Sequence, residues 1–177
     1  MAKAVRRAVL GVTGSIAAYK APLIARALIK RGVEVRAVMT PNAAQFVAAP
    51  ALATLTGHPV AQTIHDPALW SMAHLSLASW ADLVLIAPAT ADFIARLAHG
   101  RAEGVLDALV LSTKSPVVVC PAMDAEMWEH PATKANVAAL KGYGYKILGP
   151  EKGELASGKV GWGRLVEPAD IVRSVLK

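Results

Sequence analysis

The stretch "GVTGSIAAYK", residues 11–20, decides the fold, because an apolar run enters it and a helical pattern leaves it. The run "AVLGV" (8–12) predicts a buried strand, and apolar residues recur at helical spacing through 15–32. Between them, Gly14 permits a tight turn and Ser15 can cap the helix. Because first-turn N–H groups point toward such a turn, the stretch predicts a strand-to-helix turn able to bind an anion. The alternative is a capped turn that binds nothing.

The same alternation continues along the chain. We expect further strands at 33–40, 82–90, 115–123 and 145–150, and helices within 41–57, 91–113, 131–144 and 167–177. Residues 58–81 read as irregular chain followed by a short helix. Strands this apolar, separated by helices, predict an α/β fold: a three-layer, Rossmann- or flavodoxin-like parallel sheet with helices on both faces. We expect residues 1–177 to form a single domain.

Composition and charge exclude several classes of function. The net charge is +6, but the basic residues are spread out rather than gathered into a stripe, so we expect no nucleic-acid partner. A mild positive field favours an anionic small molecule. Cys120 is the only cysteine, which excludes an intrachain disulfide and favours the cytoplasm. Apolar stretches stay well short of the ~18 residues that predict a membrane helix, so we expect no membrane span.

The residues that follow the strands are the candidates for a site, since ligands of such sheets bind beyond the carboxyl ends of the strands. They include Thr40 and the turn "APATADFIA" (87–95), whose small residues let backbone amides approach a flat ligand. Helix capping by Thr90 or Asp92 is the alternative for that turn. Both strand-to-helix turns are expected at one sheet edge.

Other polar residues allow two interpretations each. Taken alone, the histidines are best read as structural, and because none pairs with carboxylates at metal-ligand spacing we predict no metal. The histidines are His58, His65, His74, His99 and His130. Cys120 is expected to be a small buried hydrophobe. In "PAMDAEMW" (121–128), Asp124 either caps a short helix or faces a ligand. "GELASGKVGWGRL" (153–165) is either a surface loop or a lid with glycine hinges.

Four of these segments, taken together, resemble the homo-oligomeric flavin-containing cysteine decarboxylases. They are 11–20, "AHLSLASWADLVLIAPATAD" (73–92), 121–128 and 153–165, and the resemblance in order and spacing covers essentially the whole chain. It implies FMN as cofactor and decarboxylation of 4'-phosphopantothenoylcysteine to 4'-phosphopantetheine in coenzyme A biosynthesis. It also implies a homo-oligomer, trimer or dodecamer, with the flavin site between subunits.

The resemblance assigns roles residue by residue. His74 matches the catalytic acid/base, a role suited to an imidazole. The phosphate of FMN would be held by Gly14, Ser15 and Ile16, and Thr40 would lie beside the ribityl chain. The flavin would face Thr90, Ala91, Asp92, Ala122 and Met123. The substrate would contact Asp124, Met127, Ser157 and Arg164, of which Asp124 and Ser157 would also be catalytic.

Two positions depart from the family pattern. Asp124 stands where the family usually has Asn, and an ionised Asp cannot donate a hydrogen bond to a substrate carboxylate. Either Asp124 is protonated, or a backbone N–H or Arg164 does that work. Ser157 stands where the family has Cys, and a hydroxyl is a much weaker acid. Two alternatives stay open: oxidative decarboxylation of a peptide C-terminal cysteine to an enethiol, and an FMN-binding regulatory subunit without turnover.

Overall fold

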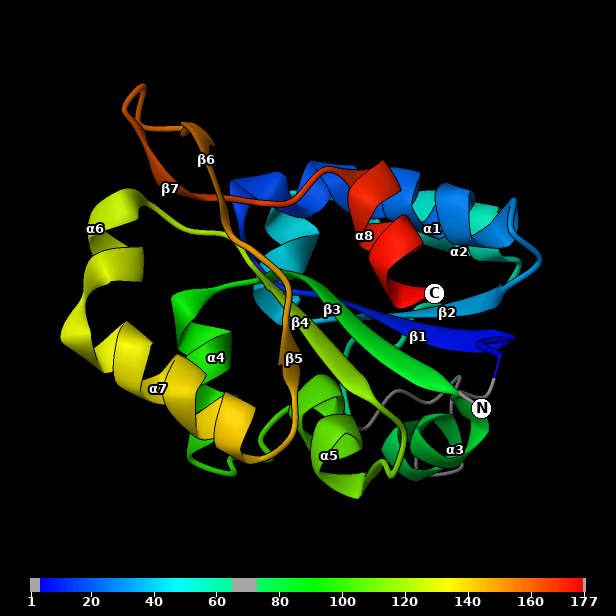
Figure 1. The fold of residues 1–177 in the computed structure, drawn as a ribbon. Helices are drawn as coiled ribbons and strands as arrows, with labels where there is room; N and C mark the ends of the chain where they lie inside the picture. The colour runs from blue at the N-terminus through cyan, green and yellow to red at the C-terminus, as the bar shows by residue number, and fades with distance from the viewer. Residues whose placement is uncertain (1–3, 65–72, 177) are drawn as a thin grey trace.

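A parallel β-sheet forms the centre of the molecule. The structure is a computed structural model that describes residues 4–64 and 73–176. Within that part of the chain, five strands pair in the order β2–β1–β3–β4–β5, all parallel (Figure 1). The strands are β1 (Arg7–Val12), β2 (Glu34–Met39), β3 (Leu83–Ala89), β4 (Val117–Pro121) and β5 (Lys146–Ile147). The predicted strands are confirmed, the last one shorter than expected.

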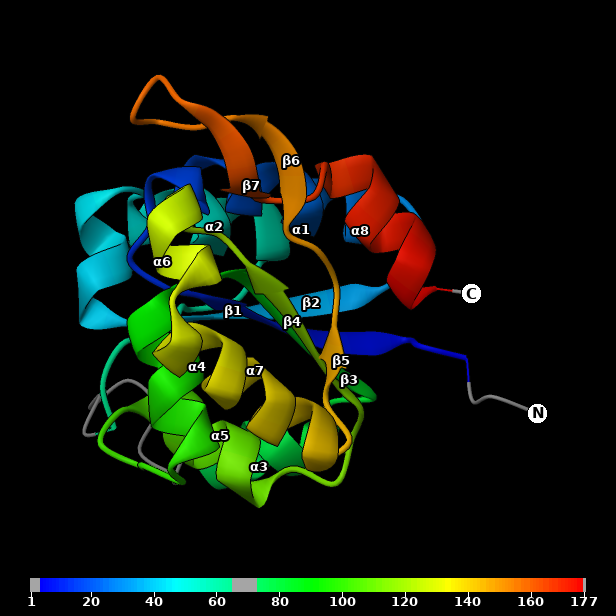
Figure 2. The ribbon, with the colours of Figure 1, turned by 60° about the vertical axis from the view of Figure 1, so that its left-hand side comes forward.

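Helices cover both faces of the sheet, which confirms the three predicted layers (Figures 1 and 2). One face carries α1 (Ala21–Ile29), α2 (Ala49–Thr56) and α8 (Pro168–Val175); the other carries α3 (Ala73–Trp80), α4 (Ala91–Ala98), α5 (Val105–Ser112) and α7 (Pro131–Gly142). Alternate residues of β1 point to opposite faces, as the pleat requires. Ala8, Leu10 and Val12 enter one hydrophobic cluster, and Val9 enters the other.

The helix expected over 15–32 is divided in two. A 3₁₀ helix, η1, spans Ile16–Lys20, and α1 begins only at Ala21. Pro22 explains the division, because proline lacks an N–H and is tolerated in the first turn of a helix but not inside it. Gly32 then takes a left-handed conformation (φ 79°) and ends this segment. Two short helices do follow within 41–57: η2 (Pro41–Gln45) and α2.

The segment 153–165 is not a loop, as one of its interpretations had it, but most of a β-hairpin. Antiparallel strands β6 (Glu151–Glu154) and β7 (Val160–Arg164) are joined by a tight turn at 155–159. Of its four glycines only Gly158 (φ 79°) lies in that turn, and Gly161 and Gly163 lie within β7. Glycine is uncommon in strands, so a segment with four glycines does not show the pattern that predicts a hairpin. It stands above the short helix α6 (Ala125–Glu129) in Figures 1 and 2.

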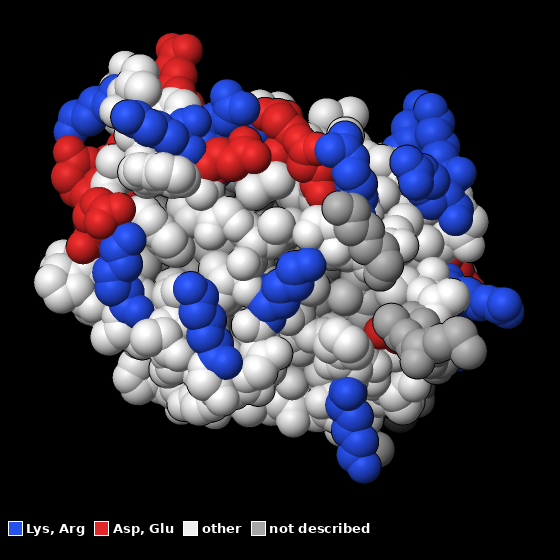
Figure 3. All heavy atoms as spheres, viewed as in Figure 1, with Lys and Arg blue, Asp and Glu red and all other residues white. Residues whose placement is uncertain are grey.

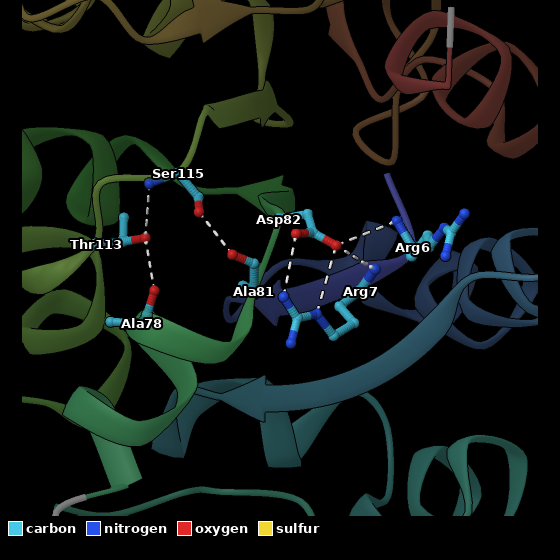
Figure 4. Close-up of polar contacts among 7 residues, drawn as sticks. All are labelled: Arg6, Arg7, Ala78, Ala81, Asp82, Thr113 and Ser115. Carbon is cyan, nitrogen blue, oxygen red and sulfur yellow. Dashed lines mark hydrogen bonds and ion pairs between the residues drawn. The ribbon is translucent and has the colours of Figure 1, made fainter. Parts of the chain in front are cut away.

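The amino-terminal edge of the sheet is closed by polar contacts (Figure 4). Asp82, with a side chain only 6% exposed, accepts hydrogen bonds from the backbone N–H groups of Arg6 (3.3 Å) and Arg7 (3.0 Å) and pairs with the Arg7 guanidinium (3.3 Å). Ser115 Oγ donates to the Ala81 carbonyl at 2.6 Å. These contacts tie the starts of β1, β3 and β4 together and leave the opposite, carboxyl-terminal edge for a ligand.

Candidate functional site

The carboxyl ends of neighbouring strands are joined through Thr13, which is 1% exposed. Thr13 Oγ1 donates to the Pro88 carbonyl at 2.8 Å and accepts from the Thr90 N–H at 3.0 Å. On the other side, the Thr40 N–H donates to the Val12 carbonyl at 3.0 Å. The two turns that the sequence predicted at one edge do lie together. Thr13 holds them in place, a role that sequence reasoning did not assign to it.

The hairpin is fastened to the end of β4. The Met123 N–H donates to the carbonyl of Gly163 in β7 at 3.0 Å. The preceding Ala122 N–H donates to the carbonyl of Ala89 in β3, also at 3.0 Å. A Cβ at position 163 would lie 2.1 Å from the Met123 carbonyl oxygen, so only glycine permits this approach. This glycine is therefore a contact point rather than a hinge.

The start of η1 is shaped by Gly14 and Ser15. Ser15 Oγ accepts from the Ala17 N–H at 3.2 Å, which confirms the predicted cap. A Cβ on Gly14 would lie 2.6 Å from the Asn42 Cβ, so glycine is needed here for packing against η2. The first N–H groups of a helix have no partner within it, so this end can receive an anion.

A cavity of about 490 Å³ lies between η1, the end of β4 and the hairpin. Its volume is within the ~300–1,000 Å³ typical of small-molecule sites. Predicted site residues on its wall are Ser15, Ile16, Ala122, Met123, Asp124, Ser157 and Arg164.

Other predicted residues lie off this wall. They are Gly14, Thr40, Thr90, Ala91, Asp92, Met127 and His74. His74 is in the first turn of α3, and Figures 1 and 2 both place α3 on the side of the molecule away from the hairpin. Its Nδ1 is buried and has no hydrogen-bond partner among the residues described. Within one chain, therefore, the cavity and the imidazole are separate.

Three charged side chains on the cavity wall form one network. Lys20 Nζ and Arg164 Nη2 approach the same oxygen of Glu167, at 2.9 and 3.0 Å. Arg164 Nε is buried and unpartnered among the described atoms. Figure 3 shows acidic and basic side chains interleaved at this end of the molecule. The sequence did not predict Lys20 and Glu167 as site residues. For Lys20 the missing information was the 3₁₀ geometry, which aligns it with Ala17 on the cavity wall.

Asp124 and Ser157, the two positions that depart from the family pattern, touch each other. Ser157 Oγ donates to Asp124 Oδ2 at 2.5 Å. The pKa of Asp124 is lowered to about 2. The larger cause is a hydrogen bond with the Glu126 side chain, and the smaller is the hydrogen bond from Ser157. Asp124 is thus ionised at neutral pH, which argues against the option of a protonated carboxyl.

Cys120 is the small buried residue that the sequence predicts. Cys120 is fully buried, and burial, opposed in part by the charge of Lys146, raises the pKa of its thiol to about 12. Over 4–64 and 73–176, no cluster of three or more His, Cys, Asp or Glu side chains could hold a metal. His65 lies outside the described residues. Across the same described ranges, no helix has the length and apolarity to cross a membrane.

Comparison with known proteins decides the family. The flavoprotein family model matches residues 2–177. The chain belongs to the flavoprotein family. This flavoprotein is 47% identical over 168 residues to the coenzyme A biosynthesis bifunctional protein CoaBC of Vibrio parahaemolyticus, covering 94% of the chain and 42% of that relative. For the Escherichia coli CoaBC the identity is 44%, with 97% and 43% covered. The chain thus spans less than half the length of these relatives.

Solved structures extend the similarity of this flavoprotein to whole chains. A mutant PPC decarboxylase complexed with pantothenoylaminoethenethiol has a TM-score of 0.85 and 30% identity, with 96% of this chain and 95% of that one covered. The FMN-dependent cysteine decarboxylase SpaF has a TM-score of 0.84 and 35% identity, with 96% and 94% covered. The flavodoxin-like α/β fold predicted from the sequence is confirmed.

Proposed function

We propose that residues 1–177 form one FMN-binding domain that decarboxylates 4'-phosphopantothenoylcysteine to 4'-phosphopantetheine in coenzyme A biosynthesis. The observation that carries the proposal is the cavity between η1 and the hairpin, in a flavoprotein that aligns with nearly all of a PPC decarboxylase chain. The CoaBC relatives support the place in coenzyme A biosynthesis. The net charge of +6 suits a phosphorylated, carboxylated substrate.

The residues present fit FMN. The start of η1 reaches the cavity wall at Ser15 and Ile16, where the Ile16 N–H and the Ser15 hydroxyl would meet a phosphate. Gly14 would complete that turn, with Thr40 and Thr90–Asp92 at the same sheet edge and the Ala122–Met123 backbone alongside. Bound FMN would accept hydride from the cysteinyl side chain, which allows the carboxylate to leave as CO₂, and would afterwards return the hydride.

The protein's own side chains would bind the substrate and move its protons. Arg164 lines the cavity, where its guanidinium contacts Glu167, and it would pair with an anionic group of the substrate. Met127, half exposed on α6, would contact the substrate beside it. Ser157 Oγ would meet the reacting sulfur region, and His74 would take and return a proton as the acid/base.

We also propose a cytoplasmic homo-oligomer, trimer or dodecamer, in which His74 of a second copy completes each site. His74 lies away from the cavity of its own chain, as described above. Ile16, Tyr19 and Leu23 are 57, 58 and 54% exposed along η1 and α1, next to that cavity, and such an apolar surface suits a partner chain. Co-assembling His74→Asn chains with Arg164→Ala chains should restore turnover that neither variant has alone. Mixed oligomers as inactive as each parent would contradict a shared site.

Product analysis tests the activity. FMN-loaded protein incubated with 4'-phosphopantothenoylcysteine should release CO₂ and form 4'-phosphopantetheine, identified by mass spectrometry. His74→Asn should keep bound FMN and lose CO₂ release. A wild-type protein that binds FMN but leaves the substrate intact would instead support a regulatory flavoprotein.

A second candidate is oxidative decarboxylation of a peptide C-terminal cysteine, ending at the enethiol. Ser157 favours it, because a hydroxyl is a weak proton donor for returning the enethiol to the thiol, and the similarity to SpaF is consistent with it. The two candidates differ in substrate and in product mass. Turnover of a peptide ending in cysteine, with none of 4'-phosphopantothenoylcysteine, would replace the first proposal by the second.

A further inference from the structure

The returning strand of the hairpin lies against residues 123–126. Gly163 receives the Met123 N–H at 3.0 Å, and a Cβ at position 161 would lie 2.7 Å from the Ala125 Cβ. Since alternate residues of a strand point to the same side, Gly161 and Gly163 give β7 a smooth face that fits this segment. The body of the hairpin is therefore fixed by backbone shape.

The tip of the hairpin is fixed differently, by two polar contacts with the same segment. Lys159 Nζ pairs with Glu126 Oε1 at 2.5 Å, and Ser157 Oγ donates to Asp124 Oδ2 at 2.5 Å. The four side chains are exposed to solvent except where they touch each other. Each contact alone therefore contributes little stability. Both Ser157 and Asp124 line the cavity, whereas Lys159 and Glu126 do not. One of the two tip contacts thus belongs to the site, and the other lies outside it.

Asp124 does not act as a helix cap. It occupies the N-cap position of α6, yet its side chain makes no capping hydrogen bond and accepts the Ser157 hydroxyl instead. The carboxylate is ionised, and a negative charge on the cavity wall repels an anionic substrate. Ser157, in turn, directs its only proton to Asp124. The two side chains are hydrogen-bonded as a unit, so the orientation of the hydroxyl depends on the carboxylate.

We propose that Asp124 is a positioning residue, which orients the Ser157 hydroxyl and holds the hairpin tip against the cavity, and that it does not bind the substrate itself. The kinetic part of this inference rests on the proposed decarboxylase activity. The contact between the hairpin and α6 does not.

A double-mutant cycle on the FMN-loaded protein tests the inference with two readouts. Hydrogen–deuterium exchange of residues 155–164 should be roughly two- to fivefold faster in Asp124→Ala and in Ser157→Ala, the range expected from an exposed polar contact. The double variant should exchange no faster than the faster single variant. In the Ser157→Ala background, Asp124→Ala should leave kcat and KM unchanged. Ser157→Thr, which keeps a hydroxyl that can donate to Asp124, should keep exchange of residues 155–164 as slow as in the wild type.

Two comparisons sharpen the experiment. Lys159→Ala removes the other tip contact and should also speed exchange of residues 155–164. Because Glu126 and Lys159 both interact with Asp124, the effects of Lys159→Ala and Asp124→Ala should be coupled rather than additive. Lys152→Ala, an exposed change on β6 away from the tip, should leave exchange and kinetics as they are.

The inference is overturned if Asp124→Ala leaves exchange of 155–164 unchanged, or if it still alters KM or kcat when Ser157 is already alanine. A wild-type protein without decarboxylase activity would refute the proposed function, while the exchange cycle would still decide whether the pair holds the hairpin.

Discussion

The fit between Gly163 and Met123 makes Gly163→Ala a sensitive test of how the site is built. The added Cβ would lie 2.1 Å from the Met123 carbonyl oxygen, and contacts under 3.0 Å are essentially never found for real Cβ atoms. Because the contact is with backbone, the hairpin itself must move, by about 1 Å or more. Gly163 also has φ 152°, which disfavours a side chain.

We expect a modest loss of stability and a larger loss of activity. The movement breaks the hydrogen bond from the Met123 N–H, which costs about 1 kcal/mol in the free energy of unfolding. A displacement of this size near the reacting groups lowers kcat/KM by roughly 10²-fold. Denaturant unfolding and steady-state kinetics measure the two effects, and amide exchange at Met123 reports the broken bond.

Gly158→Ala is the matched control. Gly158 also has a positive φ (79°), but a Cβ there meets nothing within 4 Å. It should therefore cost about 1 kcal/mol of local strain without displacing the hairpin, and exchange at Met123 should stay slow. If Gly163→Ala keeps wild-type kcat/KM and slow exchange at Met123, the hairpin is not held as described.

Three further predictions follow from the polar contacts. Thr13→Val leaves the Thr90 N–H without its acceptor and should lower the free energy of unfolding by about 2 kcal/mol, measured in denaturant and compared with Thr13→Ser, which keeps the hydroxyl. The carboxyl of Asp124 should titrate near pH 2 when followed by NMR, and the midpoint should rise in Ser157→Ala. Because the pKa of Asp124 is lower in the folded than in the unfolded protein, the ionised carboxylate stabilises the fold above about pH 4, and this stabilisation is lost as the pH falls toward 2. Asp82→Ala should cost about 3 kcal/mol in denaturant unfolding, since it removes charge-assisted bonds at the far edge of the sheet; a change under 1 kcal/mol would contradict that role.

The order of strands and helices could be predicted because the sheet is buried on both faces. Uninterrupted apolar runs such as "LVLIAPA" in β3 leave little choice of secondary structure. The turns at Thr13–Ser15 and Thr90 could be placed at one edge for the same reason, since parallel strands end together. These parts depend on local pattern and on topology, which a sequence carries.

The hairpin and the charge network could not be predicted in the same way. Strand β7 contains two glycines, which a sequence pattern does not assign to a strand. They are needed for close packing against residues 123 and 125, which is a tertiary requirement. Lys20 reaches the cavity only because Pro22 divides the expected helix and leaves a 3₁₀ segment before it. His74 matched a family position, but its distance from the cavity of its own chain depends on how α3 packs against α5, which no local pattern encodes.

The most direct test of the account is the flavin content of the purified protein. We expect a yellow protein that releases, on heat denaturation, a flavin with the mass of FMN in an amount close to one per chain. A colourless protein that also fails to take up added FMN would contradict the proposed site at the carboxyl-terminal edge of the sheet.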